Sequence, residues 1–201
     1  MNDELTLEDV SLIDWVRANK ILTSAGKEMY FNKDRKFLAE PFTDLSPMQC
    51  WMKGAQIGAS ESIIVKVLRV IQMFAISSIY TFPTGDLMQK FVAGKVNPII
   101  EANPAFKNTT DKTDNLYMKR IGKSNCIFSG AEKESQAIAF SSDLNINDEI
   151  DTSNQKIIKQ FKSRLQASKL KWEWLFSHPS LPEVGIHQAW QKSDQKHWFI
   201  R

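Results

Sequence analysis

The chain has 201 residues, of which 42% are apolar and 24% are charged, and its formal net charge is +3. This length and composition suit one α/β domain with a substantial core, and they exclude extended disorder. The small net charge gives no argument of its own for nucleic-acid binding. The two cysteines, Cys50 and Cys126, lie far apart, which favours buried free thiols in a reducing compartment over a metal-binding pair.

The first part of the chain predicts a helix followed by an irregular segment. Apolar residues recur at helical spacing over residues 4–25. Residues 26–47 have a mixed pattern with two prolines and are expected to be irregular. Tyr30 and Phe31 lie in this segment and could stack on a nucleobase, although core packing is the more common role of such aromatics.

Residues 48–74 predict a short apolar strand, a turn of small residues and an apolar helix. Such a unit holds phosphate because successive backbone N–H groups and the helix N-terminus point toward the anion. The usual pattern G-x-x-x-x-G-K-[ST] is not met, since Ala59 occupies the lysine position and Lys53 stands at the front of the loop. The alternative is an ordinary turn with small packing residues. The candidate phosphate-binding residues are Lys53, Gly54, Ala55, Gln56, Ile57, Gly58, Ala59 and Ser60, and the Ser60 hydroxyl is a candidate Mg²⁺ ligand.

A second unit follows, with a strand over residues 75–82 and a helix from Thr84, its expected N-cap, to about residue 100. The order strand–helix–strand–helix is typical of a parallel sheet with right-handed crossovers. The apolar stretch 62–82 contains Lys66 and Arg69, so we expect a core helix and strand and no membrane span.

The next segments predict a polar surface loop over residues 105–114 and a hairpin formed by residues 115–121 and 124–129. Residues 130–139 have a mixed helical pattern. An amphipathic helix is expected over residues 154–167 and a strand over residues 171–176.

Polar residues follow two of the expected strands. Asp148 and Glu149 end the strand over residues 143–151, and Ser177 and His178 follow the last strand. Ligands of open α/β sheets bind beyond the carboxyl ends of the strands. There Asp148 would hold Mg²⁺, Glu149 would deprotonate the attacking water, and Ser177 and His178 would sense the γ-phosphate. The alternative is a solvated acidic turn, with Asp151, that caps the following helix.

Taken together, these motifs resemble the ATPase domain of the large terminase subunit of tailed bacteriophages, the DNA-packaging motor. The stretch Lys53–Glu61 resembles that family's deviant phosphate loop, in which the lysine stands at the front. Residues 79–86, 91–103 and 115–131 resemble the strand, helix and hairpin that follow it. Residues 146–151 match the family's acid pair, and residues 177–180 match its coupling motif, with His178 in place of the usual threonine or serine.

The resemblance implies an α/β fold of the P-loop NTPase-like (ASCE) type, with a mostly parallel central sheet flanked by helices. This domain would span residues 30–201, after a helical lead-in over residues 1–29. The implied activity is hydrolysis of ATP with Mg²⁺. The implied roles are phosphate binding by Lys53, Gly58 and Ser60, metal binding by Asp148 and Ser60, catalysis by Glu149, and coupling by Ser177 and His178. Arg120 is a weak candidate for an arginine finger, and a solvated hairpin residue is the alternative.

The implied partners are double-stranded DNA, the portal protein and the small terminase subunit, with a homo-oligomeric ring at the procapsid portal in the host cytoplasm and no membrane. Family members continue into a nuclease domain with a carboxylate cluster; none is present here, so no DNA cleavage is expected. Two rival functions stay open: a helicase-like nucleic-acid-dependent ATPase, and a non-catalytic DNA-binding or assembly module. Candidates for contact with DNA phosphates, or for a merely solvated surface, are Lys162, Arg164, Lys169 and Lys171.

Overall fold

The fold is built on a central six-stranded sheet. The computed structural model describes residues 11–31, 33–110, 115–137 and 140–197. The strands lie in the spatial order β1-β6-β5-β2-β4-β3. Strand β3 pairs antiparallel with β4, and the other neighbouring pairs are parallel. The strands are β1 (Met48–Met52), β2 (Ser78–Phe82), β3 (Met118–Ile121), β4 (Ser124–Gly130), β5 (Leu144–Asp148) and β6 (Trp172–Ser177).

The middle of the sheet is covered on both faces. Every residue of β2 and β5 is buried. Such near-continuous burial is typical of parallel strands, whose crossover helices lie on both sides of the sheet. Strand β6 lies between β1 and β5, so the carboxyl ends of these three strands form neighbouring positions at one edge.

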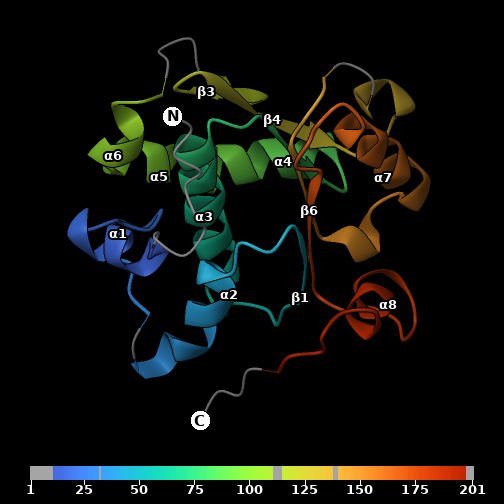
Figure 1. Cartoon of the computed structure of the whole chain (residues 1–201), viewed down its shortest axis with the longest axis horizontal. Helices are drawn as coiled ribbons and strands as arrows, with labels where there is room; N and C mark the ends of the chain where they lie inside the picture. Colours follow the sequence, from blue (N-terminus) through green and yellow to red (C-terminus); the bar gives the residue numbers. More distant parts are fainter. Residues whose placement is uncertain (1–10, 32, 111–114, 138–139, 198–201) are drawn as a thin grey trace.

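Helices pack against both faces of this sheet. In Figure 1, α1 to α3 lie on the left of the strands, and α7 and α8 lie on the right. No helix in the described ranges has the length and apolar character needed to cross a bilayer. The α-helices are α1 (Leu12–Ala18), α2 (Ala39–Thr43), α3 (Ala59–Phe74), α4 (Gly85–Phe91), α5 (Asn97–Ala102), α6 (Pro104–Lys107), α7 (Gln155–Lys162) and α8 (Gly185–Gln191), and a π-helical turn over Val92–Val96 joins α4 to α5.

The core consists of two hydrophobic clusters. The larger one contains buried residues of α1 to α6 and of strands β2 to β6, and Trp51 of β1 packs against it. The smaller one lies under α7 and α8 and includes Ile150, Phe161 and Ile186. Both α7 and α8 therefore hold the chain segments that follow β5 and β6 against the sheet by burial of apolar surface.

The expected fold class and most elements are confirmed. The hairpin forms from β3 and β4, and the Thr84 hydroxyl caps α4 by accepting the Leu87 N–H at 3.1 Å. The helical pattern after Thr84 continues to Ala102. The strand expected from residue 75 begins at Ser78, because Ala75 adopts a left-handed conformation that ends α3.

Two expectations about irregular segments were wrong. Residues 26–47 include a 3₁₀-helix (Lys33–Leu38) and α2, because Leu38 and Phe42 anchor them in the core. The loop expected from residue 105 contains part of α6, since Phe106 is fully buried; positions 111–114 lie outside the described residues.

Three helical patterns are shorter than expected. Of the pattern over residues 154–167, α7 spans Gln155–Lys162 and a 3₁₀-helix follows over Ser163–Leu165. Of the pattern over residues 4–25, α1 spans Leu12–Ala18, and residues 1–10 lie outside the described part of the chain. Of the pattern over residues 130–139, a 3₁₀-helix spans Glu134–Ala137, and residues 138 and 139 are again outside it.

Candidate functional site

The loop between β1 and α3 has the backbone of an anion-binding turn. Gln56 (φ 57°) and Gly58 (φ 83°) are in the left-handed region, and α3 begins directly after Gly58. Left-handed residues in such a turn point several N–H groups toward one side, where an anion can accept them. Gly54, Ala55 and Gln56 are exposed, so this side of the loop is open to solvent.

The backbone conformation favours glycine at position 58, and the Arg35 side chain lies close to it. The φ of Gly58 is one that residues with a Cβ rarely adopt. A Cβ there would also lie 2.8 Å from Nη1 of Arg35, whose guanidinium rests against the loop. Arg35 lies 5.8 Å from the ring centroid of Tyr30, which is 50% exposed, whereas Phe31 is buried in the core. The lead-in thus places a cation and an exposed aromatic ring beside the phosphate-loop candidate.

Lys53 joins the loop to the acid pair. Its Nζ lies 2.6 Å from Oε1 of Glu149 and 3.1 Å from Oδ1 of Asp148. The side chains of Lys53 and Asp148 are 9% and 3% exposed, and that of Glu149 is 34% exposed. The two sequence motifs, almost a hundred positions apart, therefore form one charged cluster at the edge of the sheet.

Burial and charge act in opposite directions in this cluster. Burial alone would lower the pKa of the Lys53 ammonium, but the carboxylates of Asp148 and Glu149 outweigh it, and the pKa lies above its ordinary value. Burial raises the pKa of the Asp148 carboxyl, although the Lys53 ammonium acts to lower it. The lysine therefore stays charged at neutral pH and is the group that compensates the buried carboxylate.

Asp148 and Glu149 are held in different ways. Asp148 Oδ2 accepts the buried Tyr80 hydroxyl at 3.0 Å, and Oδ1 accepts the Glu149 N–H at 3.0 Å. Glu149 is left-handed, with φ 52° and ψ 47°. A non-glycine residue in this region is strained, and such strain is concentrated at functional sites. The turn directs the Glu149 carboxylate back toward the loop.

The end of β6 completes the cluster. Ser177 is fully buried, its hydroxyl lies 3.5 Å from Glu149 Oε2, and its carbonyl accepts the Lys53 N–H at 2.9 Å. The His178 N–H donates to Glu149 Oε2 at 3.3 Å, and its ring Nδ1 lies 3.3 Å from the Lys53 carbonyl oxygen. The carboxyl ends of β1, β5 and β6 thus meet as the sequence predicted.

The acidic turn does not cap the following helix. Asn154 is the N-cap of α7, and its side chain accepts the N–H groups of Lys156 and Ile157. Asp148 is 2% exposed, which also argues against a solvated turn. The simpler interpretation of the acid pair is therefore wrong.

Sequence reasoning missed three residues at this site. Arg35 and Tyr80 are distant in the chain from their contacts, so no local pattern marks them. Asp151 accepts hydrogen bonds from the segment after the coupling motif, although its place two residues after Glu149 was a signal that could have drawn attention to it.

Arg120 lies away from the cluster. It is exposed on β3, at the opposite edge of the sheet from β1. It therefore contributes nothing to the loop of its own chain. Among the residues considered for contact with DNA phosphates, Lys162 forms a salt bridge with Glu173, in which Nζ lies 2.6 Å from Oε2.

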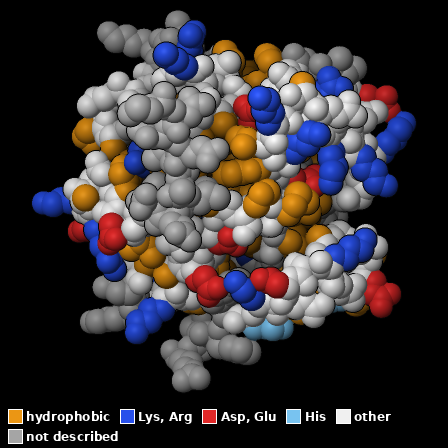
Figure 2. All heavy atoms as spheres, in the orientation of Figure 1, with side chains coloured by type: hydrophobic (Ala, Val, Ile, Leu, Met, Phe, Trp, Pro, Cys, Tyr) orange, Lys and Arg blue, Asp and Glu red, His pale blue; other side chains and the backbone are white. Residues whose placement is uncertain are grey.

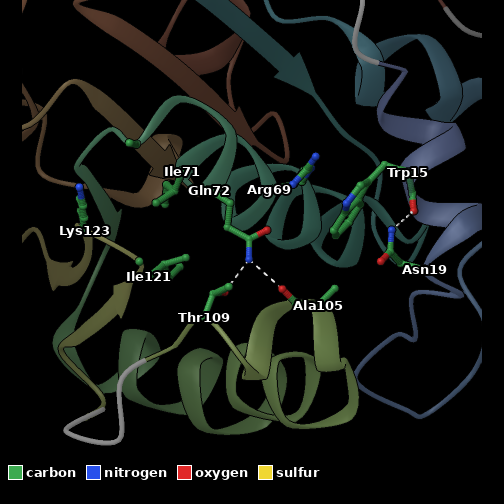
Figure 3. Close-up of a pocket in the computed structure, with 11 residues that line it drawn as sticks. Trp15, Asn19, Arg69, Ile71, Gln72, Ala105, Thr109, Ile121 and Lys123 are labelled. Carbon is green, nitrogen blue, oxygen red and sulfur yellow. Dashed lines mark hydrogen bonds between the residues drawn. The ribbon is translucent and has the colours of Figure 1, made fainter.

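A cavity of about 460 Å³ lies away from this cluster, where α3 ends (Figure 3). Arg69 lies over the Trp15 ring at 4.5 Å, and Gln72 donates to the Ala105 carbonyl and the Thr109 hydroxyl. None of the loop, acid-pair or coupling residues lines it. The charged cluster, and not this cavity, has the chemistry of a nucleotide site, so the candidate site is the cluster.

The sheet order, the loop at the end of β1 and the acid pair at the end of β5 define a domain with a P-loop NTPase-like fold. Residues 46–201 match the family described as "Phage terminase large subunit gpA, ATPase domain". The chain belongs to this family of phage terminase ATPase domains.

Solved structures show the same fold. The large terminase of bacteriophage HK97 aligns with a TM-score of 0.71 and 11% sequence identity, over 90% of this chain and 40% of that chain. The large terminase ATPase domain of Thermus phage P74-26 aligns with a TM-score of 0.58 and 14% identity, over 79% of this chain and 68% of that one. No curated protein sequence is significantly similar to the chain. The chain thus spans less than half the length of the HK97 large terminase.

Proposed function

We propose that this chain is a Mg²⁺-dependent ATP hydrolase whose reaction drives double-stranded DNA into a procapsid, as the motor domain of a terminase large subunit. The observation that carries the proposal is the direct contact of Lys53 with both Asp148 and Glu149. It joins a phosphate-loop cation to a paired carboxylate motif at the carboxyl edge of a parallel sheet, where such folds bind nucleotides.

The loop binds the triphosphate in this proposal. Backbone N–H groups from Gly54 to Ser60, at the N-terminus of α3, donate hydrogen bonds to the phosphate oxygens, and Lys53 supplies the point charge. In this proposal the triphosphate takes the place of Asp148 and Glu149 as the anionic partner of Lys53. Tyr30, exposed beside Arg35 and the loop, is the aromatic residue we assign to base stacking.

The acid pair divides the chemistry between a metal and a water molecule. The carboxylate of Asp148 and the hydroxyl of Ser60 are hard oxygen donors that fit Mg²⁺, which takes few protein ligands and keeps several waters. When bound, Mg²⁺ neutralises charge on the phosphates. Glu149 is the more exposed acid, and its left-handed turn directs it to act as the general base that orients and deprotonates the attacking water.

The end of β6 senses the state of the site. The Ser177 hydroxyl and the His178 N–H both lie against Glu149 Oε2. A change in the position of Glu149 during hydrolysis alters these contacts directly. We therefore assign coupling between hydrolysis and movement to Ser177 and His178.

Membership of the family supports a proposal for the wider assembly. We propose a homo-oligomeric ring docked on a portal protein in the host cytoplasm, with DNA delivered by a small terminase subunit and no membrane partner. Residues 30–201 would form the motor domain after a lead-in over residues 1–29. Arg120, exposed on the edge strand, stays a weak candidate for a finger that acts on a neighbouring subunit. Lys and Arg side chains gather over the α7 side of the molecule, where they would face DNA phosphates (Figure 2).

The test is steady-state ATP hydrolysis with Mg²⁺, measured alone, with duplex DNA and with single-stranded DNA. Stimulation by duplex DNA is expected for a packaging motor. Stimulation by single-stranded DNA alone, with strand separation, would support the helicase-like alternative instead. Absence of nucleotide binding would support the non-catalytic module.

A further inference from the structure

Asp151 connects the catalytic turn to the segment that follows the coupling motif. Its Oδ2 accepts both the N–H and the hydroxyl of Ser180, each at 2.8 Å, and its Oδ1 accepts the Ile186 N–H at 2.6 Å. Its own N–H donates to the Ser177 hydroxyl at 3.3 Å. Asp151 is thus hydrogen-bonded to three residues of the stretch 177–186.

The turn that carries Asp151 is a compact unit. The Glu149 carbonyl accepts the N–H and the hydroxyl of Thr152 at 3.1 and 3.0 Å, and the Ser153 hydroxyl at 3.2 Å. A 3₁₀-helix (Ile150–Thr152) follows Glu149 directly. Because these bonds tie the backbone of Glu149 to the 3₁₀-helix, a displacement of the Glu149 backbone is transmitted to Asp151.

The segment on the other side is shaped to receive Asp151. A Cβ at Gly185 would lie on Oδ1 of Asp151, and Gly185 is left-handed (φ 54°), so only glycine fits this approach. Ile186 is fully buried and belongs to the core cluster that also contains Ile150. The Cys50 thiol of β1 lies 3.6 Å from the Ile186 carbonyl oxygen. The first residues of α8 are therefore fixed between Asp151 and the strand that feeds the phosphate loop.

We propose that Asp151 is a positioning residue that links the Glu149 turn to residues 180–186 and α8, so that occupation of the nucleotide site shifts this segment. The inference rests on the proposed function. It adds that residues 180–186 and α8 are the part of the chain that responds when nucleotide binds. The surface that shifts includes two exposed apolar side chains, Leu181 and Val184, which are 62% and 48% exposed.

The chain offers a matched control at the other end of β5. Asp143 Oδ2 accepts the Ser77 N–H at 3.0 Å, and its Oδ1 accepts the Ser168 hydroxyl at 2.7 Å. Asp143 thus also joins two segments through a half-buried carboxylate, but on the side of the sheet away from the nucleotide loop. Asp143→Asn should cost stability as Asp151→Asn does, without affecting transmission.

The experiment is residue-resolved amide hydrogen exchange with and without a non-hydrolysable ATP analogue and Mg²⁺. In the wild-type chain and in Asp143→Asn, the analogue should change exchange at residues 53–60 and at Ser180 and Ile186. In Asp151→Asn, the change at residues 53–60 should persist and the change at Ser180 and Ile186 should be lost. Ser180→Ala, which removes one donor only, should retain a smaller response at Ile186.

Kinetics separate positioning from a merely structural role. Asp151→Asn should lower kcat with little change in KM, because Glu149 is less well positioned in the transition state. Asp143→Asn should leave both unchanged. Two results would overturn this inference but leave the proposed function intact. The first is a wild-type chain in which exchange changes at residues 53–60 but not at Ser180 and Ile186. The second is an Asp151→Asn variant that keeps the full exchange response and the wild-type kcat. No response at residues 53–60 in any variant would overturn the proposed function and this inference with it.

Discussion

Lys53 and Lys66 are both largely withdrawn from solvent, but their surroundings give them opposite properties. Lys53 contacts two carboxylates, which keep its pKa above the ordinary value despite burial. Lys66, on α3, is fully buried and donates to the Pro41 carbonyl at 2.7 Å and to Gln49 Oε1 at 2.9 Å. Burial lowers the pKa of Lys66 to about 7, and Asp44 only partly opposes this.

The difference lies in the partners of the two cations. The charge of Lys53 is kept by two carboxylates, and in the proposed function a triphosphate replaces them as its anionic partner. The ammonium of Lys66 lies 4.6 Å from the Trp174 ring centroid and 5.2 Å from that of Trp51, with no access for a ligand among its neighbours. A buried lysine therefore indicates a nucleotide site only when its partners are exchangeable.

The largest expected effect is that of Lys53→Ala. Loss of the phosphate-binding charge should lower ATP hydrolysis by at least about 100-fold, as removal of a preorganised charge-stabilising group does. Asp148 then stays buried without its cation, so the free energy of unfolding should fall by about 3 kcal/mol. Steady-state kinetics and urea denaturation measure the two effects.

The control for Lys53→Ala is Lys156→Ala. Lys156 pairs with Glu134 at 2.6 Å, but both side chains are exposed. Its removal should change the free energy of unfolding little, because water screens an exposed ion pair, and should leave hydrolysis unchanged. Equal losses in the two variants would contradict the special role of Lys53.

Lys66→Met should leave ATP hydrolysis unchanged but alter the pH dependence of stability. The folded-state pKa of Lys66, about 7, is below the unfolded value of 10.5, so the unfolded chain binds more protons between these values. Wild-type stability should therefore rise with pH over this window by at most about 1.4 kcal/mol per unit, relative to the variant. Lys53 has the opposite sign: its raised pKa gives stabilisation that is complete below 10.5 and is lost at higher pH.

Urea denaturation of the wild type and Lys66→Met at pH 6, 7.5 and 9 measures this difference. Parallel stability curves for the two chains would show that Lys66 does not titrate in this range. A large loss of hydrolysis in Lys66→Met would contradict its assignment as a structural cation.

The smallest effect is expected for Trp174→Phe. This change costs packing and the hydrogen bond from Trp174 Nε1 to the Ser46 carbonyl at any pH. Phe attracts a cation less strongly than Trp does, so part of the attraction between the ring and the Lys66 ammonium, which is about 1 kcal/mol, is also lost, but only where Lys66 is charged. The destabilisation should therefore be larger at pH 6 than at pH 9, and an equal loss at both would exclude this cation–π contact.

The features that could be predicted from the sequence are those that depend on residues close together in the chain. The strand–loop–helix around Lys53, the acids after β5, the hairpin and the Thr84 cap each depend on residues close together in the chain, and the structure contains all of them. The same holds for the parallel sheet, which follows from alternating strands and helices.

Contacts between distant residues could not be predicted in this way. The Tyr80–Asp148 bond joins positions 68 apart, and the Lys53–Glu149 pair requires β6 to lie between β1 and β5. Lys66 could be recognised from the sequence only as a charged residue within an apolar helix, because the tryptophans around its ammonium, Trp51 and Trp174, lie on β1 and β6. The left-handed backbone of Glu149 likewise has no signal in its residue type.

The most direct test of the proposed site is ATP hydrolysis and nucleotide binding in Glu149→Gln beside the wild type, with Mg²⁺ and duplex DNA present. Glutamine preserves the size of the side chain and its capacity to accept from the His178 N–H, but it cannot take the proton of the attacking water. We predict unchanged nucleotide affinity and a fall in turnover of at least about 100-fold, within the range that a general base contributes. Undiminished turnover in Glu149→Gln would contradict the assignment of this site.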